Sequence, residues 1–466
     1  MNDTPPLPGS TPLSRGLTRR RLIAAGGAAL LALPAFRSAC AQAGASDVDV
    51  AIVGGGAAGI AAARALAAAG RSYVLLEAGE KLGGRARTDT AFGHVFDLGA
   101  PSFARGVETE GLAGAAMAAK LPLADLPSGR RLFIDGHEAR EGGYDAFLAT
   151  LGRARRDILA ASDAGKDVAC ASVLTAPGDW SASVAALLGP LGVGRSLAEL
   201  STVDLALRAV PADDTTSPIG IGALLEALGA GLNVQTHAPV TLITNAGRLH
   251  MLSIAGQRTQ IRARAVVLAV PAPVIASGAL RFNPPLPPRL VNAFRAFPAG
   301  SIEQVAFLLP GNPLRLENDE TVLPKVSGAA DAPPPALLRA RVNGTDLHVL
   351  SFGGAPAREI AQKGESAALR LSRAFLAAAF SPQAAAAVHE VVASRWSTDP
   401  LIRGAIATAQ PGQGAQRRLF TEPVQGRIFL AGEYTALDSW GTLAGAWASG
   451  EVAAAKALRL VGGGPA

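Results

Sequence analysis

Residues 47–59 read DVDVAIVGGGAAG, and this short stretch decides the fold. Its first seven residues form an apolar, β-branched run of the kind that builds a buried strand. Gly54, Gly56 and Gly59 follow with the spacing G-x-G-x-x-G. The alanine-rich segment 57–69 is then predicted to be a helix. A strand that passes through a glycine turn into a helix is the arrangement that binds the pyrophosphate of a dinucleotide.

Each glycine of this turn has a separate physical role. Gly54 permits the tight turn, Gly56 lets the backbone approach a pyrophosphate, and Gly59 lets the helix and strand pack closely. At the start of the helix, Ala57 and Ala58 offer N–H groups that have no partner within the helix, at the positive end of its dipole. A phosphate-binding site is therefore predicted at these five residues.

An acidic residue closes the nucleotide-binding unit. The apolar segment 73–76 is predicted to be a second strand, and it ends at Glu77, which Ala78 follows. A carboxylate about 20 residues after the glycines suits the hydroxyls of a ribose and repels a 2′-phosphate. The spacing of these residues leaves both NAD and FAD open as the ligand.

A second glycine pair lies in residues 77–100, which read EAGEKLGGRARTDTAFGHVFDLGA. In this segment Gly83 and Gly84 precede Arg85 and Arg87. Flexible backbone beside fixed guanidinium groups suits a second contact with a pyrophosphate. The segment thus extends the predicted dinucleotide site.

The pattern E-x-G-x-x-x-G-G-R-x-x-T, followed by D-x-G, resembles the flavin-containing amine oxidase family. That family includes monoamine oxidases, polyamine oxidases, histone lysine demethylases and bacterial L-amino-acid oxidases. Three later stretches carry the same resemblance: IRARAVVLAVPAP at 261–273, RWSTDPLIRG at 395–404 and RIFLAGEYTALDSWGTLAGAWASGE at 427–451. The resemblance extends from residue 48 to about residue 460 and is thin between 103 and 215.

The resemblance implies an α/β fold, in which a Rossmann-type FAD-binding domain is interleaved with an α+β substrate domain. The FAD-binding domain is expected to comprise residues 47–102, 217–277 and 391–462, and the substrate domain residues 103–216 and 278–390. The implied activity is oxidation of a small-molecule amine or amino acid at a C–N bond, which gives an imine. Because the last motif contains no cysteine, we expect the FAD to be held non-covalently.

The same resemblance assigns FAD contacts along the whole chain. The backbone of Val240 is expected to meet the adenine, and a helix that begins near Thr442 would point its N-terminus at the flavin and stabilise negative charge there. The predicted FAD-binding residues are Gly54, Gly56, Ala57, Ala58, Gly59, Glu77, Ala78, Gly84, Arg85, Gly99, Ala100, Val240, Gly432, Glu433, Thr442 and Leu443.

A glutamine stands where members of the family often carry a lysine close to flavin N5. That lysine lies in a strand after a proline-rich crossover, which is FNPPLPP at 282–288 in this chain. The register places Gln304 in the lysine's position, or Glu303 if the register shifts by one. Electrons are expected to pass to oxygen or to another acceptor; since neither residue supplies a positive charge, fast reaction with oxygen is not expected, and our hypothesis is a protein or quinone acceptor.

Aromatic residues flank the flavin in the family, and two tryptophans occupy the corresponding segments. Trp396 lies in the tryptophan-aspartate-proline segment, and Trp440 lies in the last loop. Both are predicted catalytic-site residues together with Gln304, and Trp440 is the one most expected to line the pocket. The six histidines show no metal-ligand spacing, so no metal is expected.

The first 43 residues are predicted to be a twin-arginine signal peptide. LTRRRLIAAGG at 17–27 places arginines before an apolar run that ends at Phe36, and small residues follow up to Ala43. The apolar run has about 15 residues, whereas a membrane-spanning helix needs about 20. Export of the folded protein to the periplasm by the twin-arginine machinery is therefore expected, with cleavage after Ala43.

The predicted signal peptide also accounts for most of the chain's basic character. It carries five arginines and one aspartate, a net +4 of the chain's +6, which leaves about +2 for the rest. The sequence pI of 9.7 therefore gives no reason to expect a nucleic-acid partner. Cys170 is the single cysteine after residue 43, so no internal disulfide is expected.

Two other functions are compatible with these motifs. Desaturases and protoporphyrinogen oxidases share the glycine-rich start and the terminal glycine helix, but they remove hydrogen from carbon–carbon bonds or rings. An apolar, aromatic-poor substrate domain suits that reaction about as well. A flavin-binding protein without catalytic activity would also be consistent with the missing lysine.

Overall fold

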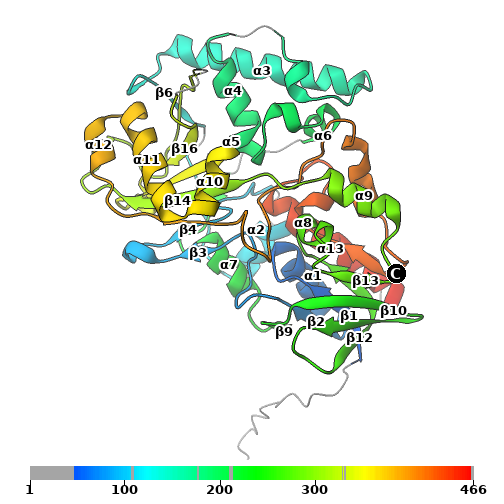
Figure 1. The fold of residues 1–466 in the computed structure, drawn as a ribbon. Helices are drawn as coiled ribbons and strands as arrows, with labels where there is room; N and C mark the ends of the chain where they lie inside the picture. The colour runs from blue at the N-terminus through cyan, green and yellow to red at the C-terminus, as the bar shows by residue number, and fades with distance from the viewer. Residues whose placement is uncertain are drawn as a thin grey trace, which may run out of the picture. The chain divides into compact units, whose positions relative to one another are not determined.

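The computed structural model describes residues 47–106, 110–127, 129–175, 178–208, 214–327, 329 and 332–462. Two β-sheets and the helices packed on them make up most of this part of the chain (Figure 1). The predicted signal peptide, at residues 1–43, lies outside the described residues.

The first sheet has eight strands in the order β13-β10-β11-β12-β1-β2-β9, with β19 beside β12. Central β1 pairs in parallel with both β12 and β2, while β10, β11 and β12 form an antiparallel meander. The strands are β1 (Asp47–Val53), β2 (Tyr73–Leu76), β9 (Val234–Gln235), β10 (Val240–Ala246), β11 (Leu249–Ile254), β12 (Gln260–Leu268), β13 (Arg281–Asn283) and β19 (Ile428–Leu430).

Burial on both faces explains why the second half of β1, residues 50–53, is a continuous apolar run. Val50, Ala51 and Ile52 are fully buried. A parallel strand covered on both sides needs an apolar side chain at nearly every position, without alternation. One face of the sheet packs against α1 and α13, and the other packs against α8 and α9. The carboxyl end of β1 therefore opens directly into the turn that begins α1.

Helices α1 (Ala57–Ala68) and α13 (Leu443–Val461) lie side by side on the first sheet (Figure 1). Glycine permits the close approaches here. A Cβ on Gly450 would lie 2.0 Å from the carbonyl oxygen of Ala58, and a Cβ on Gly59 would lie 1.9 Å from that of Gly54. The role predicted for Gly59, close packing of the helix against the strand, matches this contact.

The second sheet has seven strands in the order β18-β14-β17-β16-β15-β6-β7. All its neighbours are antiparallel except β15 and β6. The strands are β6 (Arg131–Ile134), β7 (His137–Glu138), β14 (Ile302–Leu308), β15 (Thr321–Pro324), β16 (Ala336–Arg339), β17 (Leu347–Gly353) and β18 (Val392–Ala393).

Two groups of helices cover the second sheet. One group packs on β14 and β17: α10 (Ala355–Lys363), α11 (Glu365–Ala379) and α12 (Pro382–Ala386). The other group lies at the top of Figure 1 and packs in part on β6 and β15: α3 (Glu141–Asp163), α4 (Ser181–Leu188), α5 (Pro190–Val193) and α6 (Thr202–Leu207). The remaining helices and strands are α2 (Gly111–Ala118), α7 (Ile221–Leu228), α8 (Ala272–Ala276), α9 (Pro288–Ala296), β3 (Thr88–Asp89), β4 (Phe96–Asp97), β5 (Ala124–Asp125) and β8 (Thr215–Thr216).

A buried ion pair joins α6 to the 3₁₀ segment η5 (Gly414–Thr421). Asp204 and Arg417 are 2% and 1% exposed, and two hydrogen bonds of 2.6 and 2.7 Å connect them. The guanidinium lies over the rings of Phe297 and Trp440, at 4.8 and 4.4 Å. A fully paired, desolvated contact of this kind fixes the two segments in one relative position.

The predicted fold class is confirmed: a Rossmann-type unit of strand, glycine turn, helix and strand lies beside a second α+β region. The predicted domain boundaries stay predictions. Two short strands cross them, because β13 belongs to the first sheet and β18 to the second. Among the described residues, no helix is long and apolar enough to cross a membrane.

Candidate active site

A cavity of about 1360 Å³ opens at the carboxyl ends of β1, β2 and β12. Ligand pockets usually measure about 300–1,000 Å³, so this one has room for a dinucleotide and a second molecule. It also borders on helices α3 to α6 and on strands β14 and β16. Rossmann-type folds bind their ligands at the carboxyl edge of the parallel sheet, which is where this cavity lies.

The glycine turn forms one wall of this cavity. Gly54, Gly56, Ala57 and Ala58 all line it. Gly56 is the N-cap of α1 and makes no side-chain cap bond, so the first N–H groups of the helix face the cavity without a capping side chain. The nearest atoms to a Cβ built on Gly56 belong to Gly83 and Gly84 and are 3.9 Å away, so no atom of the described residues fills the space beside this bare backbone at the cavity. The turn therefore fits a pyrophosphate.

The second glycine pair meets the first, as expected. Gly56 forms a β-bridge with Gly83, and a Cβ on Gly84 would lie 3.3 Å from the Cα of Gly56. Gly84 also has φ +60, a left-handed conformation that favours glycine. Two stretches of bare backbone, 27 residues apart in sequence by their numbering, thus lie together at the cavity.

Glu77 is oriented by two backbone amides. Its Oε2 accepts from the N–H of Gly55 and its Oε1 from that of Gly79, both at 2.6 Å. Each carboxylate oxygen keeps a second acceptor position. Ala78 and Val240 line the same cavity. A carboxylate held in place with acceptor positions to spare fits ribose hydroxyls.

The D-x-G motif joins this wall to helix α7. The carboxylate of Asp97 accepts hydrogen bonds from the N–H groups of Ile221 and Gly222 and from the hydroxyl of Thr88. A Cβ on Gly99 would lie 2.0 Å from the carbonyl oxygen of Arg85. Gly99 and Ala100 both line the cavity, so the motif positions backbone there.

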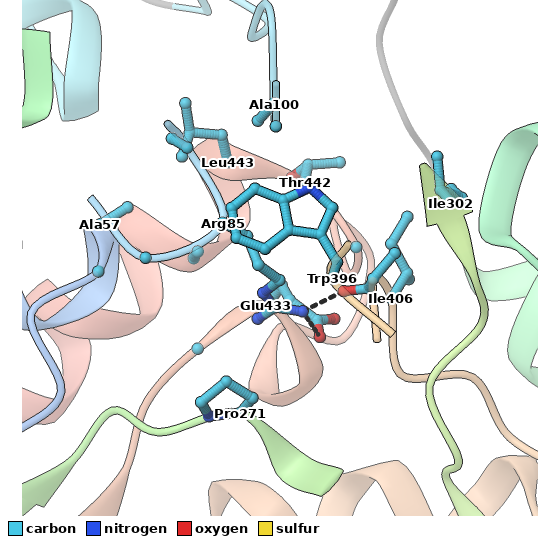
Figure 2. A pocket seen from close by; sticks show the side chains of 18 of the residues that line it. Ala57, Arg85, Ala100, Pro271, Ile302, Trp396, Ile406, Glu433, Thr442 and Leu443 are labelled. Atoms are coloured by element: carbon cyan, nitrogen blue, oxygen red, sulfur yellow. Dashed lines mark hydrogen bonds and ion pairs between the residues drawn. The ribbon is translucent and has the colours of Figure 1, made fainter. Parts of the chain in front are cut away.

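Arg85 and Glu433 form an ion pair in the cavity wall (Figure 2). Nη1 of Arg85 donates to Oε1 of Glu433 at 3.0 Å and also to the carbonyl oxygen of Ala405. The second carboxylate oxygen of Glu433 is buried and has no hydrogen-bond partner among the described residues. A buried orphan acceptor costs about 1–3 kcal/mol, so it fits a donor supplied by a ligand, such as a hydroxyl.

Helix α13 begins at the cavity. The side chain of Thr442 caps it by accepting from the N–H of Gly445 at 2.9 Å, and Thr442, Leu443 and Gly432 line the cavity. The positive end of a 19-residue helix therefore faces the ligand space. Taken together, the two glycine segments, Glu77, the orphan oxygen and this helix end fit a flavin dinucleotide.

Gln304 lines the cavity, which supports the first of the two registers predicted for this strand. Its Nε2 donates to the carbonyl oxygen of Gly99 at 2.6 Å, and its Oε1 is buried without a partner among the described residues. Glu303 is fully buried and does not line the cavity. Side chains alternate along a strand, so the two residues face opposite ways.

Glu303 instead organises the loop that carries Trp396. Its carboxylate accepts from the N–H groups of Trp396 and Ser397, at 2.8 and 2.9 Å, and from the hydroxyls of Ser394 and Ser397, at 2.7 and 2.9 Å. Burial is the largest influence on its carboxyl group and raises the pKa, although these four hydrogen bonds oppose that effect. Sequence reasoning treated Glu303 only as an alternative to Gln304 and missed this role.

Trp396 is held rigidly at the cavity (Figure 2). Its indole N–H donates to the carbonyl oxygen of Leu98 at 2.7 Å, and the guanidinium of Arg87 lies 4.9 Å from the ring centroid. The side chain is 6% exposed. A ring fixed on one edge by a hydrogen bond and on one face by a cation can serve as a flat wall for a ligand.

Trp440 does not line the cavity, so the expectation for its placement was wrong. The residue is 1% exposed and packs with Val193, Leu197 and Leu200. Its ring is covered by Arg417, and its N–H donates to the carbonyl oxygen of Asp204 at 3.1 Å. The Trp440 ring packs against the buried ion pair, and the neighbouring residues Gly441 and Thr442 line the cavity instead.

Gly59, which was also predicted to bind FAD, packs behind the cavity wall and does not line the cavity.

Several cavity residues were not predicted. Pro271 follows β12, and its position could have been inferred from the rule that ligands meet the carboxyl ends of parallel strands. Ile302 precedes Gln304 by two residues on β14, so strand alternation assigns it to the same face. A chamber of aliphatic side chains from α3 to α6, with Ile406 beside it, had no sequence signal because the resemblance is thin there. Among the described residues, no group of three acidic, histidine or cysteine side chains could hold a metal ion.

A Rossmann-type sheet whose glycine turns and helix ends face a dinucleotide-sized cavity, joined to an aliphatic chamber, defines a dinucleotide-dependent oxidoreductase. Residues 191–458 match the family model described as flavin containing amine oxidoreductase, and residues 52–113 match the NAD(P)-binding Rossmann-like domain. The first match covers more than half of the chain, so the protein belongs to the flavin-containing amine oxidoreductase family and uses FAD.

Individual proteins resemble the chain at a lower level. Lysine-specific histone demethylase 2 of Homo sapiens is 28% identical over 260 residues, which are 52% of this chain and 30% of the demethylase. The chain thus spans only about a third of that protein. Polyamine oxidase 3 of Oryza sativa subsp. japonica is 26% identical over 86% of this chain and 87% of its own length. A structure of putrescine oxidase bound to putrescine has a TM-score of 0.74 at 19% identity, over 89% of this chain and 100% of that one, which shows the shared fold.

Proposed function

We propose that this protein oxidises an amine at a C–N bond, with FAD as the hydride acceptor and an imine as the product. One observation carries the proposal: the dinucleotide wall and the aliphatic chamber belong to one continuous cavity, and Gln304 and Trp396 line it. An amine can be oxidised this way with little acid–base chemistry if it arrives neutral and correctly oriented. The family membership favours C–N over C–C bonds.

The residues of the chain supply orientation and exclusion of water. Trp396 is fixed by the carbonyl oxygen of Leu98 and offers a rigid face. Gln304 is fixed through its Nε2, so its uncharged amide is held in one position. Aliphatic side chains such as Leu188 and Ile302 make the remaining wall. A neutral amine is desolvated in such surroundings at low cost, whereas an ammonium ion is not.

Anaerobic absorbance spectroscopy tests this proposal. Purified FAD-loaded protein is mixed with primary, secondary and amino-acid amines, and the oxidised-flavin band near 450 nm is followed. We expect one class of amine to bleach the band. Bleaching by polyenes, and by no amine, would support the carbon–carbon alternative. A stable band that nothing bleaches would point to a flavin-binding protein without this activity.

The electron acceptor is proposed to be a protein or a quinone. Gln304 supports this, because it is neutral and replaces a lysine that would supply positive charge for oxygen reduction. Gln304→Lys should therefore raise the rate at which air restores the flavin band, and Gln304→Met, of similar length but neutral, should not. If the lysine variant reacts with oxygen no faster than the parent, the residue does not explain acceptor choice.

Export by the twin-arginine route remains part of the proposal. Its support is the sequence LTRRRLIAAGG and the general point that a folded protein can carry its FAD across the membrane. Replacing Arg19 and Arg20 with lysine should leave flavin-containing protein in the cytoplasm. Cell fractionation followed by flavin fluorescence measures this, and unchanged periplasmic fluorescence would contradict the export assignment.

A further inference from the structure

The charged residues in the chamber wall point to the kind of amine that can enter. Apart from Glu77 and the Arg85–Glu433 pair, the described charged residues that line the cavity comprise four arginines and two aspartates, namely Arg130, Arg155, Arg208, Arg339, Asp214 and Asp319. The arginines therefore outnumber the acids on the side of the cavity away from the dinucleotide wall.

Both aspartates already have partners. Arg339 donates from two nitrogens to Oδ1 of Asp319, at 2.7 and 3.0 Å, and both side chains are less than one fifth exposed. Oδ1 of Asp214 accepts from the N–H of Arg105 and from the hydroxyl of Thr215. On this side of the cavity, a second ammonium group would thus meet two carboxylates that already accept hydrogen bonds through Oδ1.

Arg155 stands at the exposed edge of the chamber. It lies on α3 one turn before Leu159, and both residues line the cavity while remaining exposed, Leu159 by 48%. Leu151, one turn earlier on the same face, also lines the cavity. Arg155 has no hydrogen bond or ion pair in the described structure, so its charge is not neutralised by a neighbour.

The interior of the chamber would not stabilise a second charge. Leu187, Leu188 and Leu191 line it from α4 and α5, and Leu205 lines it from α6. Transfer of an unpaired charge from water into such surroundings is strongly unfavourable. Arg155 at the edge of the chamber adds repulsion, which a few ångströms of solvent would reduce but not remove.

We propose that this enzyme selects amines with one basic nitrogen and an apolar body and rejects diamines and polyamines, and that Arg155 is a specificity-determining residue. The proposal rests on the amine-oxidising function proposed above. Selection would operate by exclusion: the aliphatic wall accepts a hydrocarbon chain, and the unpaired guanidinium at its edge repels a second ammonium group.

Length-matched pairs of amines test this directly. The FAD-loaded full chain is mixed anaerobically with hexylamine or 1,6-diaminohexane, and with octylamine or 1,8-diaminooctane, at one pH. The second-order rate of flavin bleaching is expected to be at least ~10-fold higher for the monoamine of each pair, from the unfavourable burial and repulsion of the second charge. Salt should narrow the ratio by screening Arg155, which is exposed.

Two charge-reversal variants test whether Arg155 causes the preference for monoamines over diamines. Arg155→Glu should narrow the monoamine-to-diamine ratio at least ~3-fold. Arg153→Glu is the matched control, because Arg153 is exposed on the same helix and does not line the cavity; it should leave the ratio unchanged. Equal rates for the two members of a pair in the parent protein, or equal ratios in both variants, would overturn this inference while leaving amine oxidation intact. Bleaching by none of the four amines, nor by any other amine class, would overturn the proposed function and the inference with it.

Discussion

Replacing Asp204 by asparagine is expected to lower the free energy of unfolding by about 4 kcal/mol, because it leaves a buried guanidinium without its counter-charge. Asp204 and Arg417 are almost completely buried and share two short hydrogen bonds. The remaining donors of Arg417 reach only the carbonyl oxygens of Tyr434 and Ala407, at 3.0 and 3.1 Å. In either orientation an asparagine would turn its amide nitrogen toward a donor of Arg417, and in one of the two it would also face the N–H of Ala409, which now donates to Asp204.

The magnitude follows from the burial and geometry of this pair. Removing one partner from a buried ion pair costs about 3–5 kcal/mol, whereas an exposed pair contributes about 0–1 kcal/mol. The rings of Phe297 and Trp440 retain part of the favourable interaction with the cation, so the middle of that range is expected. A chain of this size unfolds with an entropy of roughly 0.9 kcal/mol/K, so the melting temperature should fall by about 4–5 °C.

Thermal unfolding of the FAD-loaded protein, followed by circular dichroism and by flavin fluorescence, measures the effect. The double variant Asp204→Leu/Arg417→Met provides the decisive comparison, since it removes both charges together. Each single variant, Asp204→Leu or Arg417→Met, leaves one buried charge unpaired. If that unpaired charge causes most of the destabilisation, the loss in free energy of unfolding for the double variant should be smaller than the summed losses of the two single variants by about 2 kcal/mol or more. A melting temperature within 1 °C of the parent for Asp204→Asn, or additive single variants, would refute the reasoning.

Three further predictions concern the cofactor wall and the second sheet. Gly56→Val should abolish FAD binding, because its side chain would occupy the space facing the cavity, and the ratio of flavin to protein absorbance after purification measures this. Thr442→Ala should lower stability by about 1 kcal/mol through loss of the α13 cap, detectable as a shift of about 1 °C in melting temperature. Burial lowers the pKa of His348 to about 4 from its usual 6.5, so its contribution to stability is complete above pH 6.5 and falls by up to ~3 kcal/mol as the pH drops toward 4. His348→Phe should therefore reduce the loss of melting temperature between pH 7.5 and 4.5, and an identical loss in both proteins would exclude this histidine as the cause.

Sequence reasoning could place the dinucleotide wall because backbone geometry constrains it. Gly54 has φ +103 and would carry a Cβ 2.7 Å from the carbonyl oxygen of Ala269, so the motif reports a local steric requirement. The same holds for Gly99 against Arg85. Steric requirements of this kind involve only a few residues that are close in sequence, so a short sequence pattern is enough to detect them.

The placement of Trp440 could not be obtained in this way. Its neighbours Gly441 and Thr442 reach the cavity, but the ring turns away to cover Arg417. That choice depends on the pairing of Arg417 with Asp204, residues 213 positions apart. In an irregular loop no periodicity relates one side chain's direction to the next, so only the assembled core decides it.

The aliphatic chamber was missed for a related reason. Helix α3 shows a regular apolar face, but periodicity cannot tell which flank of that face borders a cavity and which meets a sheet. Leu151 and Arg155 line the cavity, whereas Phe147 and Ala154 pack in the hydrophobic core with Trp180. Without strong motifs between 103 and 215, nothing in the sequence distinguished these positions.

The contact between α1 and α13 has a consequence for the order in which the protein is made. Gly56 leaves the ribosome long before Thr442, yet both belong to one wall, and Gly450 of α13 packs against Ala58 of α1. A nascent chain that has already formed its glycine turn still lacks the helix end that completes the wall. FAD should therefore bind only after α13 has been translated, and a ribosome that stalls before residue 442 would leave a chain with the nucleotide motif intact but unable to keep its flavin.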